Sequence, residues 1–149
     1  MSDELPAPDF PALADPIGLD ESAGPVVTVP LYRLAHARTG DKGDRLNCAV
    51  IAWVPEHMPV LVEQVTEARV LQLFAHRGAT RVRRFLLPRL GAMNLVIDDV
   101  LQGGVTMSLG LDGHGKSLSY LVLALPVTLR QALLDAADAA IAAANAKWR

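Results

Sequence analysis

Residues 37–47 read Ala-Arg-Thr-Gly-Asp-Lys-Gly-Asp-Arg-Leu-Asn and lie between two apolar runs. The run before them, residues 26–37, is rich in Val, Leu and Ala, and the run after them, residues 48–54, has the composition of a strand. The pattern predicts two strands joined by a dense polar loop. Such a loop is either a solvated turn or a place where ligand chemistry gathers, and we favour the second interpretation.

The glycines and cations of this stretch indicate an anion site. Gly40 and Gly43 can adopt positive φ, so that consecutive backbone N–H groups converge on one point. Arg38 and Lys42 add fixed positive charge near that point. We therefore expect these four residues to bind a carboxylate or a phosphate, with Asn47 fixing the loop by hydrogen bonds.

Two acids in the same stretch, Asp41 and Asp44, leave alternatives open. They repel an anion unless they are paired with Arg38, Lys42 or Arg45. They can instead serve as a general base that orients a water or a proton, or hold a divalent cation with Asn47 as a third oxygen donor. A further alternative is a surface turn whose charges cancel in local ion pairs. We take Asp41 and Asp44 as the candidate catalytic residues.

A second polar cluster, residues 112–117, reads Asp-Gly-His-Gly-Lys-Ser. It is expected to form the turn of a hairpin between strands at residues 105–111 and 117–127. Asp112 and Lys116 join the candidate substrate-binding residues if this turn meets the first polar stretch at one end of the sheet. The alternative is an exposed hairpin turn.

Length and composition fit one domain, since 149 residues with a hydrophobic fraction of 51% can build an ordinary core. Apolar runs fall short of the roughly 20 residues that span a bilayer, and no basic and apolar leader opens the chain. The single cysteine, Cys48, excludes an internal disulfide and is expected in the core. We therefore expect a cytoplasmic protein with no membrane partner.

Charge is unevenly distributed along the chain. Residues 1–25 contain six acids and no base, so the ten acids and fourteen bases that follow leave an excess of +4. This mild excess suits an anionic small molecule, and without interleaved aromatic residues it does not indicate nucleic acid. No zinc site is expected, because ligand spacing is missing among His36, His57, His76 and His114.

The chain divides into three parts. Residues 1–25 contain five prolines and are expected to be a disordered tail or an extended arm. Residues 26–127 form the domain, and residues 128–149 form a long Ala-rich helix with Thr128 as its N-cap. The small side chains of that helix favour contact between chains, so an oligomer is expected.

From residue 26 to the C-terminal helix, periodicity predicts the order ββαβαββα, with earlier helices at residues 58–75 and 90–101 and later strands at 81–87, 105–111 and 117–127. The first helix is expected in two pieces, with Thr66 as the second N-cap. In the strand at 81–87, Val82 faces the core while Arg81 and Arg83 face solvent. Asn94 on the second helix is either a structural hydrogen-bonding group or a ligand contact. The order predicts an α+β two-layer sandwich.

Several of these motifs together resemble one family. They are residues 34–44 (Leu-Ala-His-Ala-Arg-Thr-Gly-Asp-Lys-Gly-Asp), Asn47, residues 90–94 (Leu-Gly-Ala-Met-Asn), the pair at 103–104 (Gly-Gly) and residues 112–116. In this order they are similar to the ferredoxin-fold domain of the acyclic terpene utilisation protein A (AtuA) family, from about residue 30 to residue 126. The resemblance implies a ferredoxin-like sandwich, with a mixed or antiparallel sheet and helices on one face, and a larger partner subunit. It further implies catabolism of branched or terpenoid acids, often as coenzyme A thioesters, and it brings no catalytic assignment.

The expected function is therefore a small subunit or accessory domain that completes an acyl-CoA- or carboxylate-processing site with a larger AtuA-like subunit. A stand-alone acyl-CoA hydratase or lyase is one alternative, and a non-catalytic interaction module is another. The expected partners are that larger subunit and an anionic small molecule, with an acyl-CoA as the leading candidate. The sequence identifies no cofactor.

Overall fold

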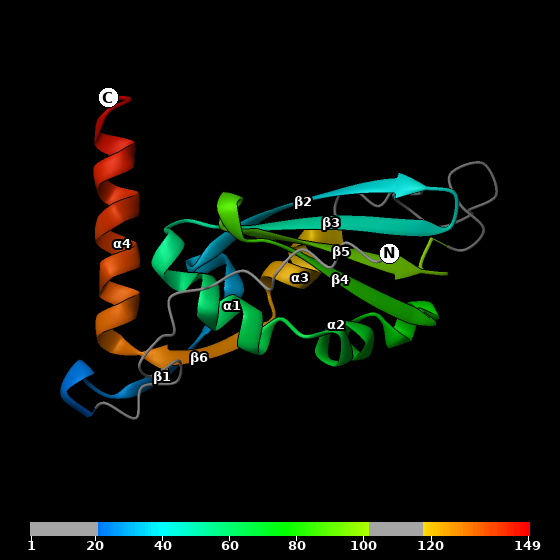
Figure 1. The fold of residues 1–149 in the computed structure, drawn as a ribbon, viewed down its shortest axis with the longest axis horizontal. Coiled ribbons are helices and arrows are strands. Elements are labelled where there is room, and N and C mark those ends of the chain that lie inside the picture. The colour runs from blue at the N-terminus through cyan, green and yellow to red at the C-terminus, as the bar shows by residue number, and fades with distance from the viewer. Residues whose placement is uncertain (1–20, 102–117) are drawn as a thin grey trace, which may run out of the picture.

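A computed structural model describes residues 21–101 and 118–149 of the chain. Its centre is a four-stranded antiparallel sheet with the order β2–β3–β5–β4 (Figure 1). The strands are β2 (Ala35–Lys42), β3 (Arg45–Ala52), β4 (Arg81–Leu87) and β5 (Ala92–Asp98). One face of the sheet packs against three short helices, which are α1 (Met58–Gln64), α2 (Glu67–Leu73) and α3 (Ser119–Leu123). This is the two-layer α+β sandwich that the sequence predicts.

The core lies between the sheet and these helices. Its largest fully buried side chains include Leu46 from β3, Leu95 and Ile97 from β5, and Phe74 from the end of α2. Along β3 and β5 these buried positions alternate with more exposed ones, as a sheet with one covered face requires.

We expected the polar stretch at residues 37–47 to be a loop, and this is wrong. It forms most of a β-hairpin. β2 runs to Lys42 and β3 begins at Arg45, so only Gly43 and Asp44 form the turn. Gly43 has φ of +64°, and a glycine at the first turn position is what a II′ hairpin turn requires. Strand alternation, rather than loop chemistry, therefore decides where the polar side chains of this stretch point.

The single strand expected at residues 26–37 is also wrong. It is divided into β1 (Val26–Pro30), the 3-10 helix η2 (Leu31–Arg33) and the start of β2. β1 leaves the main sheet and pairs with β6 (Pro126–Arg130) as a separate two-stranded ribbon. The break falls at Pro30, which cannot donate to a ladder and is tolerated at the end of a ribbon strand.

Residues 90–101, which we expected to be helical, form the end of η5 (Pro88–Leu90) and then strand β5. Gly91 lies between them with φ of +58°. β5 pairs with β3 on one side and β4 on the other, so tertiary pairing decides its conformation. Over so short an apolar run, periodicity does not separate a central strand from a helix.

Two predictions about the region from 58 to 87 are confirmed. The helix is in two pieces, and Thr66 caps the second, its Oγ1 accepting a hydrogen bond from Arg69 N at 3.3 Å. β4 follows at the predicted residues and is tied to α1 by Arg84, whose Nη1 donates to Val62 O at 2.6 Å and Val65 O at 2.9 Å. A cation beside the last carbonyls of a helix is favoured by the helix dipole.

The segment after residue 117 differs from the prediction. Residues 117–127, expected as a strand, contain α3 and only the start of β6. The final helix, α4 (Gln131–Ala146), begins three residues later than expected, because Thr128 belongs to β6. Thr128 exchanges two hydrogen bonds with the Gln64 side chain, from its N to Oε1 at 2.7 Å and from Nε2 to its O at 2.5 Å. The Gln64 side chain thereby pairs with the backbone N–H and C=O of Thr128, as a neighbouring strand would.

From β3 onward, the elements of the described residues follow the order β–α–β–β–α–β, counting α1 and α2 as one helical layer. That is the order of a ferredoxin-like motif. Here the last strand, β6, pairs with β1, and the edge position beside β3 is occupied by β2. The fold is therefore a ferredoxin-like sandwich with a C-terminal helix, as the sequence analysis expected.

Three short 3-10 helices complete the description: η1 (Glu21–Ala23), η3 (Pro55–His57) and η4 (Ala75–Arg77). The strand expected at residues 105–111, the turn at 112–115 and the first 20 residues of the arm lie outside the described residues. Within the ranges that the structure does describe, none of the helices has the length and apolarity needed to cross a membrane.

Candidate functional site

The sheet face that points away from α1, α2 and α3, here called the open face, carries a regular grid of side chains. Strand register aligns one residue from each of β2, β3, β5 and β4 in every row. In that strand order the four rows are Lys42–Arg45–Asp98–Arg81, Gly40–Asn47–Val96–Arg83, Arg38–Ala49–Asn94–Phe85 and His36–Ile51–Ala92–Leu87. Neighbours within a row have Cβ atoms about 5 Å apart.

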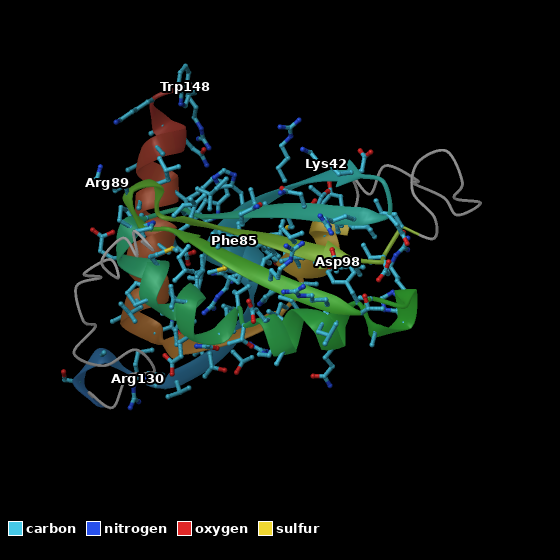
Figure 2. All side chains as sticks on the ribbon, turned by 45° about the vertical axis from the view of Figure 1, so that its right-hand side comes forward. Lys42, Phe85, Arg89, Asp98, Arg130 and Trp148 are labelled. Carbon is cyan, nitrogen blue, oxygen red and sulfur yellow. The ribbon has the colours of Figure 1, made fainter. Side chains whose placement is uncertain are left out.

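One end of the open face is cationic. Lys42, Arg45, Arg81 and Arg83 surround a single carboxylate in this part of the described structure, that of Asp98. Arg45 Nε donates to Asp98 Oδ1 at 2.6 Å, and Arg83 Nη2 lies 3.6 Å from the same oxygen. Figure 2 shows Lys42 and Asp98 at this end. One carboxylate among four cations leaves an excess of positive charge that suits an anion.

The guanidinium of Arg83 is only partly paired. Its Nε is shielded from solvent and has no hydrogen-bond partner among the described residues. A buried donor without a partner is uncommon in folded proteins and is costly.

The opposite end of the open face is apolar and exposed. Phe85 is 49% exposed and Leu87 41%, and beyond their rows Trp53 is 44% and Leu90 71% exposed. Trp53 is held in place, since its ring stacks on His36 with centroids 4.6 Å apart and its Nε1 donates to Tyr32 O at 3.1 Å. Figure 2 shows Phe85 between the cationic end and Arg89, which lies on η5. Large apolar side chains gathered in this way mark an interaction surface.

The middle of the open face has small residues surrounded by polar side chains. Gly40 has open space where a Cβ would stand, and its diagonal neighbour Ala49 has a small side chain. Around them lie Arg38, Asn47 and Asn94, which together offer a guanidinium fork and two amides. A ligand that crosses this region can approach the backbone of β2 closely.

The structure separates the predicted site residues into three groups. Arg38, Gly40, Lys42 and Asn47 lie together on the open face. Gly43 forms the hairpin turn, while alternation along β2 directs Asp41, which has a polar partner, to the opposite face. Asp112 and Lys116 lie outside the described residues.

Asp44 has a visible structural contact. Its Oδ1 accepts a hydrogen bond from Leu101 N at 2.7 Å, and its backbone oxygen accepts one from Val100 N at 3.1 Å. Both Val100 and Leu101 are fully buried. The hairpin turn is thus fastened to the segment that follows β5, and the proposed chemical role of Asp44 stays a prediction.

Cys48 behaves as the core residue that was expected. It is fully buried, and desolvation raises the pKa of its thiol from 9.0 to about 12. A thiol with so high a pKa is a poor nucleophile at neutral pH. Elsewhere in residues 21–101 and 118–149, no three His, Cys, Asp or Glu side chains gather as a metal site would require.

Sequence reasoning missed the partners that complete the open face. The alternation of Arg81, Val82 and Arg83 did predict a solvent-facing row, and Phe85 continues that row. Asp98 and Asn94 were missed as members of the same surface, because residues 90–101 were expected to be helical. Their alignment with Arg45 and Ala49 depends on the register between β3 and β5.

The fold and this surface define a class of protein, a small α+β sandwich with one sheet face uncovered by described residues and divided into cationic and apolar ends. The chain belongs to the AtuA ferredoxin-like domain family, whose pattern matches residues 29–128. The match covers the whole four-stranded sheet and its helices, begins within β1 and ends within β6, and leaves α4 outside. Neither the curated proteins nor the solved structures contain a significant match.

Proposed function

We propose that this chain is a small subunit or accessory domain that completes an acyl-CoA- or carboxylate-processing site together with a larger AtuA-like subunit. The observation that carries the proposal is the division of the open face into a cationic end and an exposed apolar end. Membership of the family supports an AtuA-related role.

A second surface is needed because a sheet face does not enclose a ligand. Small-molecule sites bury most of the ligand in a concave pocket, whereas the open face has exposed side chains along its length. The cluster of Trp53, Phe85, Leu87 and Leu90 resembles the aromatic and aliphatic centre of a protein interface. A larger subunit seated on this end would cover the apolar residues and close the site above the middle rows.

The ligand class follows from the order of the rows. Six residue steps separate His36 from Lys42, which is about 20 Å of strand. An acyl-CoA is anionic at its phosphates and apolar at its acyl chain, and the open face offers complementary ends in that order. We assign the phosphates to Lys42, Arg45 and Arg83. The acyl chain would lie toward Phe85, with its carbonyl near Arg38, Asn47 and Asn94.

The chemical step takes its acid–base groups from the larger subunit in this proposal. Asp41 and Asp44 are off the open face, one by strand alternation and the other by its bond to Leu101 N. Asp44 fastens the hairpin that presents Arg38 and Lys42 to the segment after β5. Asp112 and Lys116 remain candidate substrate contacts within the same proposal.

Co-expression of the full chain with a larger AtuA-like subunit tests the proposal. Phe85→Asp should abolish co-purification while leaving the fold intact, because Phe85 is exposed at the apolar end where the larger subunit is placed. Tyr120→Asp is the matched control, since Tyr120 is 74% exposed but lies on α3, on the covered side of the sheet. Equal co-purification of wild type and Phe85→Asp would contradict the docking part.

Calorimetric titration with free coenzyme A and with hexanoyl-coenzyme A tests the ligand part. Lys42→Ala and Arg83→Ala should each weaken binding by the complex about tenfold, whereas Lys147→Ala, remote from the open face, should not. Turnover of hexanoyl-coenzyme A by the isolated chain would indicate a stand-alone enzyme instead. Complex formation with no coenzyme A binding would indicate an interaction module.

A further inference from the structure

The outer part of α4 forms a surface that is separate from the open face. Within the described structure only Leu134 and Ala137 of this helix are buried. Figure 1 shows that its C-terminal half extends past the sheet on the side away from α1 and α2, and Figure 2 shows Trp148 at the far end. A shallow groove runs along it, lined by Asp138, Ile141, Ala142, Asn145, Ala146 and Arg149.

Five of these residues lie on one face of α4, at positions i, i+3, i+4, i+7 and i+8 from Asp138, and Arg149, which follows the end of the helix at Ala146, lines the same groove. They are also self-complementary under a two-fold axis. Consider two copies of α4 that lie antiparallel, with the two-fold axis between residues 143 and 144. Residues that lie equally far from that point on opposite sides then face each other across the interface. Asp138 then faces Arg149, Ile141 faces Ala146 and Ala142 faces Asn145.

We propose that this groove is a contact surface between two copies of the chain, packed antiparallel through α4. An isologous interface requires a patch that is complementary to itself, and the groove pairs its acid with its base and its largest apolar residue with a small one. The alanines allow the two helix axes to approach to about 8 Å. The proposal does not depend on the function assigned to the open face.

The carboxylate of Asp138 can bind one cation within its own chain and a second cation in the other copy. Asp138 Oδ2 accepts from Arg33 Nη2 at 2.9 Å within one copy. The same carboxylate retains Oδ1, which accepts no hydrogen bond among the described residues and can accept from the guanidinium of Arg149 in the second copy. Two such pairs form, one at each end of the helix pair, and they fix the antiparallel direction.

The expected affinity is moderate. Two helix faces of this length bury less than the roughly 1,600 Å² of a standard interface. Self-association should therefore appear in the micromolar range and depend on concentration. Light scattering of the full chain between about 1 and 200 μM should show a shift from monomer to dimer.

Charge reversal tests the pairing. Asp138→Arg and Arg149→Asp should each weaken the dimer at least tenfold, and the double variant should restore it. Lys147→Ala is the control, since it removes a nearby cation that does not line the groove. A wild type that stays monomeric at the highest concentration overturns the proposal, as does a dimer that survives both single reversals.

Cysteine cross-linking gives an independent readout. A mixture of Ala142→Cys and Asn145→Cys should form a mixed disulfide rapidly. Ala136→Cys, on the opposite side of α4, should form a disulfide-linked dimer more slowly. The native thiol, Cys48, is buried and does not compete. Equal rates for the two sets would exclude antiparallel packing on this face. Coenzyme A binding should be unchanged in all these variants, so failure here is distinguishable from failure of the proposed function.

Discussion

Arg45 Nε and Asp98 Oδ1 are 2.6 Å apart on the open face, which makes this ion pair the closest charge contact at its cationic end among the described residues. Asp98 is 17% exposed at its side chain and also lies 3.6 Å from Arg83 Nη2. The carboxylate therefore restrains neighbouring cations that would otherwise repel one another. It also competes with any anion that approaches them.

Asp98→Asn should have opposite effects on stability and on anion binding. Loss of the charge should lower the free energy of unfolding by about 0.5–1 kcal/mol, because the pair is partly exposed and screened. Binding of free coenzyme A should become tighter, since the cations lose their internal competitor. Urea unfolding and calorimetric titration measure the two effects. Glu63→Gln on the exposed surface of α1 removes the same charge and should leave coenzyme A binding unchanged; weaker binding in Asp98→Asn would contradict the assignment.

Substitutions at Asp44 distinguish a structural role of its carboxylate from a chemical one. Asp44→Ala should lower the free energy of unfolding by about 1–3 kcal/mol, because the buried N–H of Leu101 loses its acceptor. Asp44→Asn keeps an acceptor oxygen and should retain most of that stability. Thermal or urea unfolding ranks the three proteins. If Asp44→Asn is as unstable as Asp44→Ala, the contact with Leu101 is not what the carboxylate contributes.

The thiol of Cys48 should be inert in the folded protein. Its pKa of about 12 lies above the value of 9.0 for an exposed thiol, so the unfolded chain releases the proton at lower pH than the folded one. The contribution of this thiol to the free energy of unfolding is fully present below pH 9. It is lost as the pH rises toward 12, by up to about 1.4 kcal/mol per pH unit. Dithionitrobenzoate should react only after unfolding. The Cys48→Ala variant should show a shallower loss of stability above pH 9; an identical slope would contradict the burial effect.

Two glycines of the same hairpin should respond differently to alanine. Gly43→Ala places a Cβ at φ of +64° and should cost about 1–2 kcal/mol, although no atom lies within 4 Å of that Cβ. Gly40→Ala also meets nothing within 4 Å and has no positive φ, so the free energy of unfolding should stay the same or rise slightly. Urea midpoints measured side by side test the difference, and equal losses would show that the turn does not depend on left-handed geometry.

Sequence patterns predicted the parts of this fold whose signals are local. The cap at Thr66, the strand at 81–87 and the core position of Cys48 all depend on neighbouring residues, and all are confirmed. The helix expected at 90–101 was wrong because strand pairing with β3 and β4, which is not encoded locally, decides that segment.

The same limit applies to the candidate site. Residues 37–47 were correctly singled out as polar, but their division between two faces follows from strand alternation that a loop assignment cannot supply. Thus Arg38 and Lys42 point to the open face while Asp41 points away from it. Long-range neighbours such as Asp98 become visible only once the register is known.

The pairing of Val26 with Arg130 means that the chain enters and leaves the sandwich at one ribbon. Segments joined before β1 or after β6 therefore start from adjacent points and need not cross the sheet. Units whose entry and exit coincide can be spliced into, or attached to, longer polypeptides with little disturbance of their interior. The β1–β6 ribbon therefore allows this sandwich to be attached to another polypeptide at a single point of its surface.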